Sequence, residues 1–121
     1  MRKLTVVILI LGLSVLTACD LDSAASEKPS AAERGAKLIA EVGCGSCHHI
    51  PGIKGATGLV GPPLHHMANR VFIAGKLRNS PENMVRWIEN PQAVSPGNAM
   101  PDMGLTERQA RDITAYLATL E

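Results

Sequence analysis

Apolar residues recur at helical spacing in three segments, which are separated by stretches rich in glycine and proline. The first helix is predicted to begin after Ser30, which forms a capping box with Glu33. The second is predicted from Pro81 to Asn90, and the third begins at Thr106 with a second capping box. The side chains predicted to face inward are Ala36, Leu38, Ile39 and Val42, then Met84, Val85, Trp87 and Ile88, and finally Ala110, Ile113, Leu117 and Leu120.

Two stretches between these helices, 50–64 and 91–103, contain so much glycine and proline that we predict loops there. The region from Leu64 to Leu77 is predicted to be a short helical region, with apolar side chains at four positions, namely Met67, Val71, Phe72 and Ile73. No segment alternates between apolar and polar residues with the period of two typical of a strand. The pattern therefore predicts one all-α domain over residues 31–121.

The N-terminal segment has the pattern of an export signal. Arg2 and Lys3 precede an aliphatic run over residues 4–16, which is shorter than the roughly 20 residues of a membrane span. The run ends in Leu-Thr-Ala-Cys, which resembles the lipobox of bacterial lipoproteins. That resemblance implies a signal peptide over residues 1–18, a lipid-modified Cys19 and a polar tether over residues 19–30. An uncleaved anchor and an ordinary cleaved signal are alternatives, and each places the domain outside the cytoplasm. We expect the periplasmic side of the bacterial cell membrane.

The charge of the chain excludes one class of partner. The sequence has 12 basic and 11 acidic side chains, and loss of residues 1–18 would remove Arg2 and Lys3. The remaining chain would then carry a small acidic excess. This balance does not fit a nucleic-acid-binding protein, so we do not expect the protein to bind nucleic acid.

Cys44, Cys47 and His48 form a C-x-x-C-H motif, which is the attachment pattern of a c-type haem. The two thiols can each add across a vinyl group of the macrocycle, and the imidazole can bind the iron from below. A C-x-x-C pair has two other common uses. A thioredoxin-like disulfide requires a preceding strand, and a structural zinc site requires a second ligand pair at suitable spacing. Neither context is present in the sequence, and with Cys19 lipidated no cysteine remains for a disulfide.

The small number of aromatic residues indicates that a haem forms much of the core. The chain has one Phe, one Trp and one Tyr. A haem that buries about twice the roughly 200 Å² of an aromatic side chain would add on the order of 10 kcal/mol at about 25 cal/mol per Å². We therefore expect the chain without haem to be poorly folded.

The second loop offers two thioethers, Met100 and Met103, as the sixth iron ligand. Methionine opposite histidine raises the reduction potential and leaves no open position on the iron. The alternative of bis-histidine ligation would use one of three residues, His49, His65 or His66. Met103 is otherwise expected to pack beside the haem.

Taken together, these motifs resemble a class I cytochrome c over residues 30–121. The resemblance rests on the first helix, C-x-x-C-H, Gly-Pro-x-Leu, Met-Pro and a final helix that ends in Ala-Tyr-Leu-x-x-Leu. It implies that Met100, directly before proline, is the sixth ligand. It further implies that the carbonyl of Pro62 accepts a hydrogen bond from His48, and that Gly35 and Tyr116 mark the crossing of the first and last helices.

A second resemblance is to the cytochrome domain fused to subunit II of some haem–copper oxidases. The residues that carry it are Gly61-Pro62 through Arg70, Ala74-Gly75, Asn83, Trp87-Ile88, Pro91-Gln92, Pro96-Gly97 and Met100-Pro101. That similarity implies that Arg70 and Trp87 lie near the haem, as partners of its propionates. A surface arginine and a core tryptophan are the alternatives.

We therefore expect a one-electron carrier and not an enzyme: an exported, anchored monohaem cytochrome c of a respiratory chain, with a terminal oxidase as its partner. One alternative is a haem-bearing relay subunit of a dehydrogenase or oxidase complex. Another is a haem sensor or a peroxidase-like enzyme with an open sixth position, which Met100 argues against.

Overall fold

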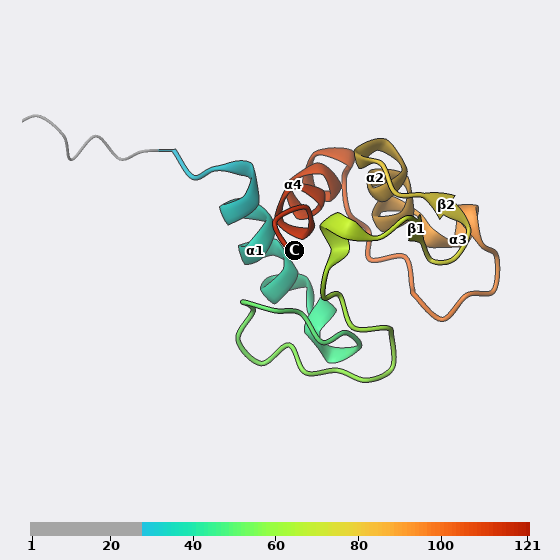
Figure 1. Cartoon of the computed structure of the whole chain (residues 1–121), viewed down its shortest axis with the longest axis horizontal. Coiled ribbons are helices and arrows are strands. Elements are labelled where there is room, and N and C mark those ends of the chain that lie inside the picture. Colours follow the sequence, from blue (N-terminus) through green and yellow to red (C-terminus); the bar gives the residue numbers. More distant parts are fainter. Residues whose placement is uncertain (1–27) are drawn as a thin grey trace, which may run out of the picture.

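The computed structural model describes residues 28–121, and this part consists of four α-helices, a small hairpin and long connecting loops. Figure 1 shows how they are arranged. The helices are α1 (Ala31–Val42), α2 (Pro81–Glu89), α3 (Pro91–Val94) and α4 (Glu107–Leu117). The hairpin strands are β1 (Phe72–Ile73) and β2 (Leu77–Arg78), and two 3₁₀ turns, η1 and η2, span Cys44–Ser46 and Met67–Asn69. None of the described helices has the length and apolarity needed to cross a membrane. The predicted signal peptide (1–18), Cys19 and most of the tether (19–30) lie outside the described residues.

The three predicted helices are confirmed, because their capping groups act as the sequence indicates. The hydroxyl of Ser30 accepts from the Glu33 amide while the Glu33 carboxylate accepts from the Ser30 amide. Thr106 and Gln109 form the same reciprocal pair at α4. The helix α2 begins at Pro81 and ends at Glu89, one residue before the predicted end.

Helices α1 and α4 lie side by side in Figure 1, and they cross at Gly35. A Cβ on Gly35 would lie 2.0 Å from the carbonyl oxygen of Asp112, so the two backbones can approach this closely only at glycine. The predicted crossing partner, Tyr116, lies one turn further along α4. Its hydroxyl donates to the carbonyl oxygen of Pro51 at 2.6 Å, because the loop after the C-x-x-C-H motif returns to that side of α4. The predicted role of Gly35 at the crossing is confirmed, and the backbone atoms nearest to it belong to Asp112 and Ile113.

The helices bury a continuous cluster of apolar side chains, to which α1, α2 and α4 all contribute. The members that are most deeply buried on these helices are Ile39, Met84, Val85, Ile88, Ala110, Ile113 and Leu117. The connecting loops add Ile50, Ala56, Met67, Ile73 and Leu105. Most of these residues also line a cavity whose wall includes the C-x-x-C-H motif.

The predicted helical region from Leu64 to Leu77 is wrong in its second half. Met67–Asn69 is a single 3₁₀ turn, and the chain then forms the β1–β2 hairpin with Ile73 opposite Leu77. Ala74 and Gly75 make the turn in the left-handed region, with φ of 50° and 67°. In the described residues this hairpin is the only sheet, and the all-α fold class is confirmed. The predicted loop over 91–103 also contains a short helix, α3, which Asn90 caps.

Candidate functional site

The C-x-x-C-H motif lies on the turn that directly follows α1. Gly43 ends this helix in the left-handed conformation, with φ of 85°, and the chain then forms the η1 turn. The amide of His48 donates to the carbonyl oxygen of Cys44 at 3.0 Å. Both cysteines are free thiols, and burial raises the pKa of the Cys44 thiol. The turn brings Cys44, Cys47 and His48 to the wall of one cavity.

The loop from 50 to 64 wraps around this turn and orients the imidazole of His48. The amide of Gly61 donates to the carbonyl oxygen of Cys47 at 2.7 Å. The Nδ1–H of His48 donates to the carbonyl oxygen of Pro62 at 2.7 Å, because a carbonyl can only accept. The neutral ring then carries its proton on Nδ1 and leaves the lone pair of Nε2 free to bind a metal. This is the hydrogen bond that the sequence resemblance implied.

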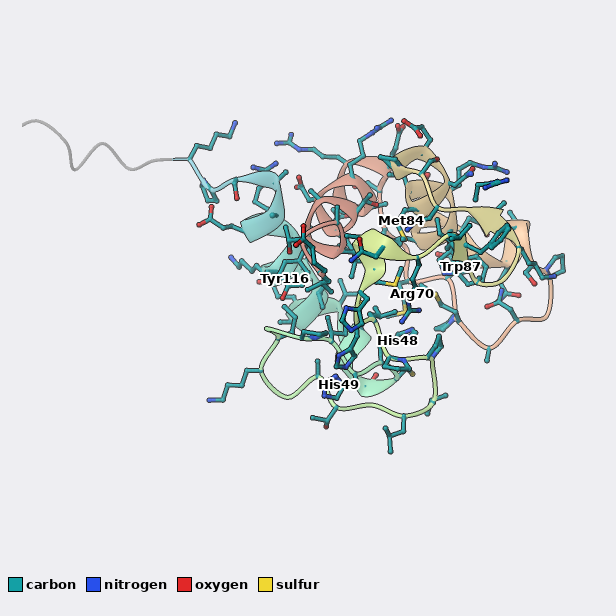
Figure 2. The ribbon with its side chains drawn as sticks, in the orientation of Figure 1. His48, His49, Arg70, Met84, Trp87 and Tyr116 are labelled. Carbon is teal, nitrogen blue, oxygen red and sulfur yellow. The ribbon has the colours of Figure 1, made fainter. Side chains whose placement is uncertain are left out.

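The cavity beside the motif has a volume of about 600 Å³ and a mainly apolar lining. Figure 2 shows His48 on its lower side, with Met84 on α2 among the side chains opposite. The apolar residues that line it include Ile39, Ile50, Leu64, Met67, Ile73, Met84, Ile88, Leu105, Ile113 and Leu117. Its size falls within the range of roughly 300–1,000 Å³ that is typical of cofactor sites.

Met100 and Met103 both line this cavity from the loop that connects α3 to α4. The amide of Met100 donates to the side-chain oxygen of Asn98 at 2.8 Å, and its carbonyl accepts from the amide nitrogen of the Gln92 side chain at 2.8 Å. Met100 is half-buried, whereas Met103 is 39% exposed. Of the two thioethers, Met100 therefore has the more fixed backbone and the more buried side chain.

Arg70 and Trp87 also line the cavity, and Figure 2 labels both. One terminal nitrogen of Arg70 donates to the carbonyl oxygens of Pro63 and His65. These hydrogen bonds hold the guanidinium against the end of the loop that follows the motif. Trp87 reaches the cavity from α2 and is half-buried.

The three remaining histidines do not line the cavity. The rings of His49 and His65 stack with their centroids 4.6 Å apart, and His65 Nε2 lies 2.8 Å from His49 Nδ1. His66 lies beside them, exposed and with φ of 55°. Within residues 28–121, no group of three or more His, Cys, Asp or Glu side chains is arranged to hold a metal ion. The bis-histidine alternative therefore lacks a second imidazole at the cavity wall.

Comparison with known proteins identifies the family. The family model described as cytochrome c matches residues 32–121. The chain belongs to the cytochrome c family. As a monohaem class I cytochrome c, it is an electron-transfer haem protein.

Curated relatives of this cytochrome are all described as cytochrome c oxidase subunit 2. The chain is 34% identical over 102 residues to that of Alkalihalophilus pseudofirmus, covering 82% of this chain and 29% of the relative. It is 34% identical over 82 residues to that of Bacillus sp. PS3, covering 64% and 23%. It is also 34% identical over 71 residues to that of Bacillus subtilis, covering 57% and 20%. The chain thus spans less than a third of the length of these relatives. No solved structure matches it.

The residues of this cytochrome fit the haem c that the family binds covalently. Two thiols and an imidazole with a free Nε2 line one wall of the cavity, and two thioethers stand in the segment that closes it. The apolar lining suits the porphyrin face, and Arg70 supplies a positive charge for acidic substituents. Sequence reasoning placed Gln92 among the positions of the family resemblance but assigned no role to it or to Asn98. The features that could have indicated them in the sequence are their positions, because Gln92 directly follows Pro91 and Asn98 stands two residues before Met100.

Proposed function

We propose that this cytochrome is an exported, membrane-anchored one-electron carrier that passes electrons in a respiratory chain to a terminal oxidase. The observation that supports a closed electron-transfer site is that Cys44, Cys47, His48 and Met100 line one cavity. These four residues supply two attachment points and two axial ligands for a single haem. A site with both axial positions filled favours electron transfer over oxygen chemistry.

Each of these side chains has a distinct role in the proposal. Bound haem supplies an iron that alternates between the ferric and ferrous states. Thioethers to Cys44 and Cys47 hold the macrocycle, and His48 binds the iron through Nε2. Pro62 fixes the tautomer of that imidazole and raises its basicity. Met100 fills the sixth position, which keeps water and other ligands away from the iron.

Arg70 and Trp87 complete the site as partners of the haem propionates. The guanidinium of Arg70 has further N–H donors besides the two hydrogen bonds to Pro63 and His65. The indole N–H of Trp87, which lines the cavity from α2, is a second donor. Both groups are suited to carboxylates that reach the cavity edge.

The membrane anchor and the acceptor rest on the sequence and the relatives. The lipobox-like segment before Cys19 supports attachment to the periplasmic side of the cell membrane through acyl chains. The oxidase subunits among the relatives support a haem–copper oxidase as electron acceptor. The same relatives favour one alternative, a relay subunit held within an oxidase complex.

Membranes from cells that produce the full chain or its Cys19→Ser variant test the anchor and the electron acceptor together. Covalent haem should be found in the membrane fraction of the wild type and in the soluble fraction of Cys19→Ser, because the variant lacks the acylated thiol.

In wild-type membranes that contain a haem–copper oxidase, oxygen should reoxidise the reduced haem, and cyanide should block this reaction. Soluble haem in both strains would contradict the anchor, and cyanide-insensitive reoxidation would contradict the acceptor. Co-purification with oxidase subunits would support the relay role.

A further inference from the structure

The side chain of Gln92 is hydrogen-bonded at both ends to the loop that carries Met100. Its amide nitrogen donates to the carbonyl oxygens of Asn98, at 3.0 Å, and Met100, at 2.8 Å. Its carbonyl oxygen accepts from the amide of Gly97 at 3.0 Å. One half-buried carboxamide therefore replaces the regular hydrogen bonds that this segment lacks.

The side chain of Asn98, which is itself part of this loop, forms further hydrogen bonds within it. Its side-chain nitrogen donates to the carbonyl oxygens of Pro91, at 2.9 Å, and Ser95, at 2.7 Å. Its side-chain oxygen accepts from the amide of Met100 at 2.8 Å. Both backbone polar groups of Met100 are thus bound by amide side chains, its N–H by Asn98 and its carbonyl by Gln92.

This arrangement connects Met100 to the core. Residues 101–106 have no helix or strand, so the segment that follows Met100 does not fix its position. Helix α3 fixes the position of Met100 instead, because its first residue, Pro91, is fully buried and Gln92 follows directly. Figure 1 shows the loop returning from α3 toward α4.

We propose that Gln92 is a positioning residue for the axial thioether, because its carboxamide keeps the Met100 loop closed on the cavity. This inference rests on the proposed function, in which Met100 is the sixth ligand. Gln92 touches neither the iron nor the haem in this role. It sets the fraction of molecules in which the loop is open and the sixth position can accept an outside ligand.

Imidazole added to the ferric protein measures this fraction. It can bind the iron only after Met100 has left, so its apparent affinity is the intrinsic affinity multiplied by the open fraction. Loss of the hydrogen bonds of Gln92 should raise the open fraction by about ten- to a hundredfold. Imidazole should therefore bind about ten- to a hundredfold more tightly.

The experiment titrates imidazole into the ferric holoprotein and follows loss of the weak far-red band of methionine–iron coordination. The variants are Gln92→Leu, which removes all three hydrogen bonds, and Gln92→Glu. The glutamate keeps the shape of the side chain but places a carboxylate against two carbonyl oxygens, so its effect should be at least as large. The matched control is Gln109→Leu, which removes a capping hydrogen bond at Thr106 and no contact with the Met100 loop. Its imidazole affinity should stay within about twofold of the wild type.

The outcomes separate the two proposals. A wild-type protein without the far-red band would overturn the Met100 ligand and this inference with it. A wild-type band with unchanged imidazole affinity in both Gln92 variants would overturn only the positioning role. An equal increase in Gln109→Leu would also overturn it, because the effect would then be general destabilisation. If Gln92→Leu does not fold, the imidazole affinity of Gln92→Glu alone tests the positioning role.

Discussion

At the scale of single residues, Gly61 sets how closely the backbone packs against the proximal imidazole. A Cβ at this position would lie 2.4 Å from Cε1 and 2.7 Å from Nδ1 of His48. The next residue, Pro62, accepts the hydrogen bond from the same ring. The contact with Gly61 and the hydrogen bond to Pro62 together fix the imidazole in a single orientation. Axial ligation requires such a fixed orientation.

The Gly61→Ala variant should displace this imidazole. The added methyl group overlaps the ring, so we expect a loss of about 1–3 kcal/mol in the free energy of unfolding and a shifted reduction potential. Thermal unfolding and a potentiometric titration of the holoprotein measure the two effects. The control is Gly75→Ala, where φ of 67° costs about 1 kcal/mol but no atom lies within 4 Å of the added carbon. A potential unchanged in Gly61→Ala, or equally shifted in Gly75→Ala, would contradict this role.

At the scale of elements, an ion pair fastens the crossing of α1 and α4. Arg34 donates from Nε to one carboxylate oxygen of Asp112 at 2.9 Å and from a terminal nitrogen to the other at 2.6 Å. The pair lies directly beside Gly35, and the side chain of Asp112 is only 10% exposed. The bidentate hydrogen bond from Arg34 lowers the pKa of Asp112. The crossing therefore depends on a charged carboxylate.

This lowered pKa predicts the direction of the pH dependence. The ionised carboxylate stabilises the fold above its unfolded pKa of about 4, and this contribution is lost as the pH falls through the lower folded value. Asp112→Asn should therefore lower Tm by about 5 °C or more at pH 7, and the difference from the wild type should shrink below about pH 4. Melting curves between pH 7 and pH 2 measure it. Glu107→Gln, in the exposed pair with Arg111, should change Tm much less. A difference between wild type and Asp112→Asn that stays constant with pH would contradict the ion pair.

At the scale of the whole molecule, the domain is built around the cavity that the haem fills. Helices α1, α2 and α4 and the segments that connect them contribute to its wall, and the helices meet one another mainly at the α1–α4 and α2–α4 contacts. The apolar cluster surrounds the cavity instead of filling it. This shape agrees with the small number of aromatic residues in the sequence. The cofactor takes the central place that large side chains occupy in other small domains.

The main helices and the motif could be predicted from the sequence because their signals are local. Ser30 with Glu33 and Thr106 with Gln109 mark helix starts within four residues. The C-x-x-C-H spacing likewise indicates its chemistry without any knowledge of the fold. The hydrogen bond from His48 to Pro62 spans 14 residues and was available only from the family resemblance.

The features that sequence reasoning missed depend on tertiary structure. The hairpin strands have two residues each, too few to show an alternating pattern, and Ala74 adopts a left-handed conformation that is uncommon for alanine. The short helix α3 depends on the side chain of Asn90 and on burial of Pro91. The role of Gln92 appears only when the loop after α3 is folded back onto it.

The far-red absorption spectrum of the ferric holoprotein tests the central claim most directly, since that claim is a haem ligated by His48 and Met100. The wild type and Met103→Ala should both show the weak charge-transfer band of methionine–iron coordination, and Met100→Ala should lack it. All three proteins should retain covalent haem, because Cys44 and Cys47 are unchanged. A band that survives in Met100→Ala and disappears in Met103→Ala would contradict the account, as would a wild type without the band.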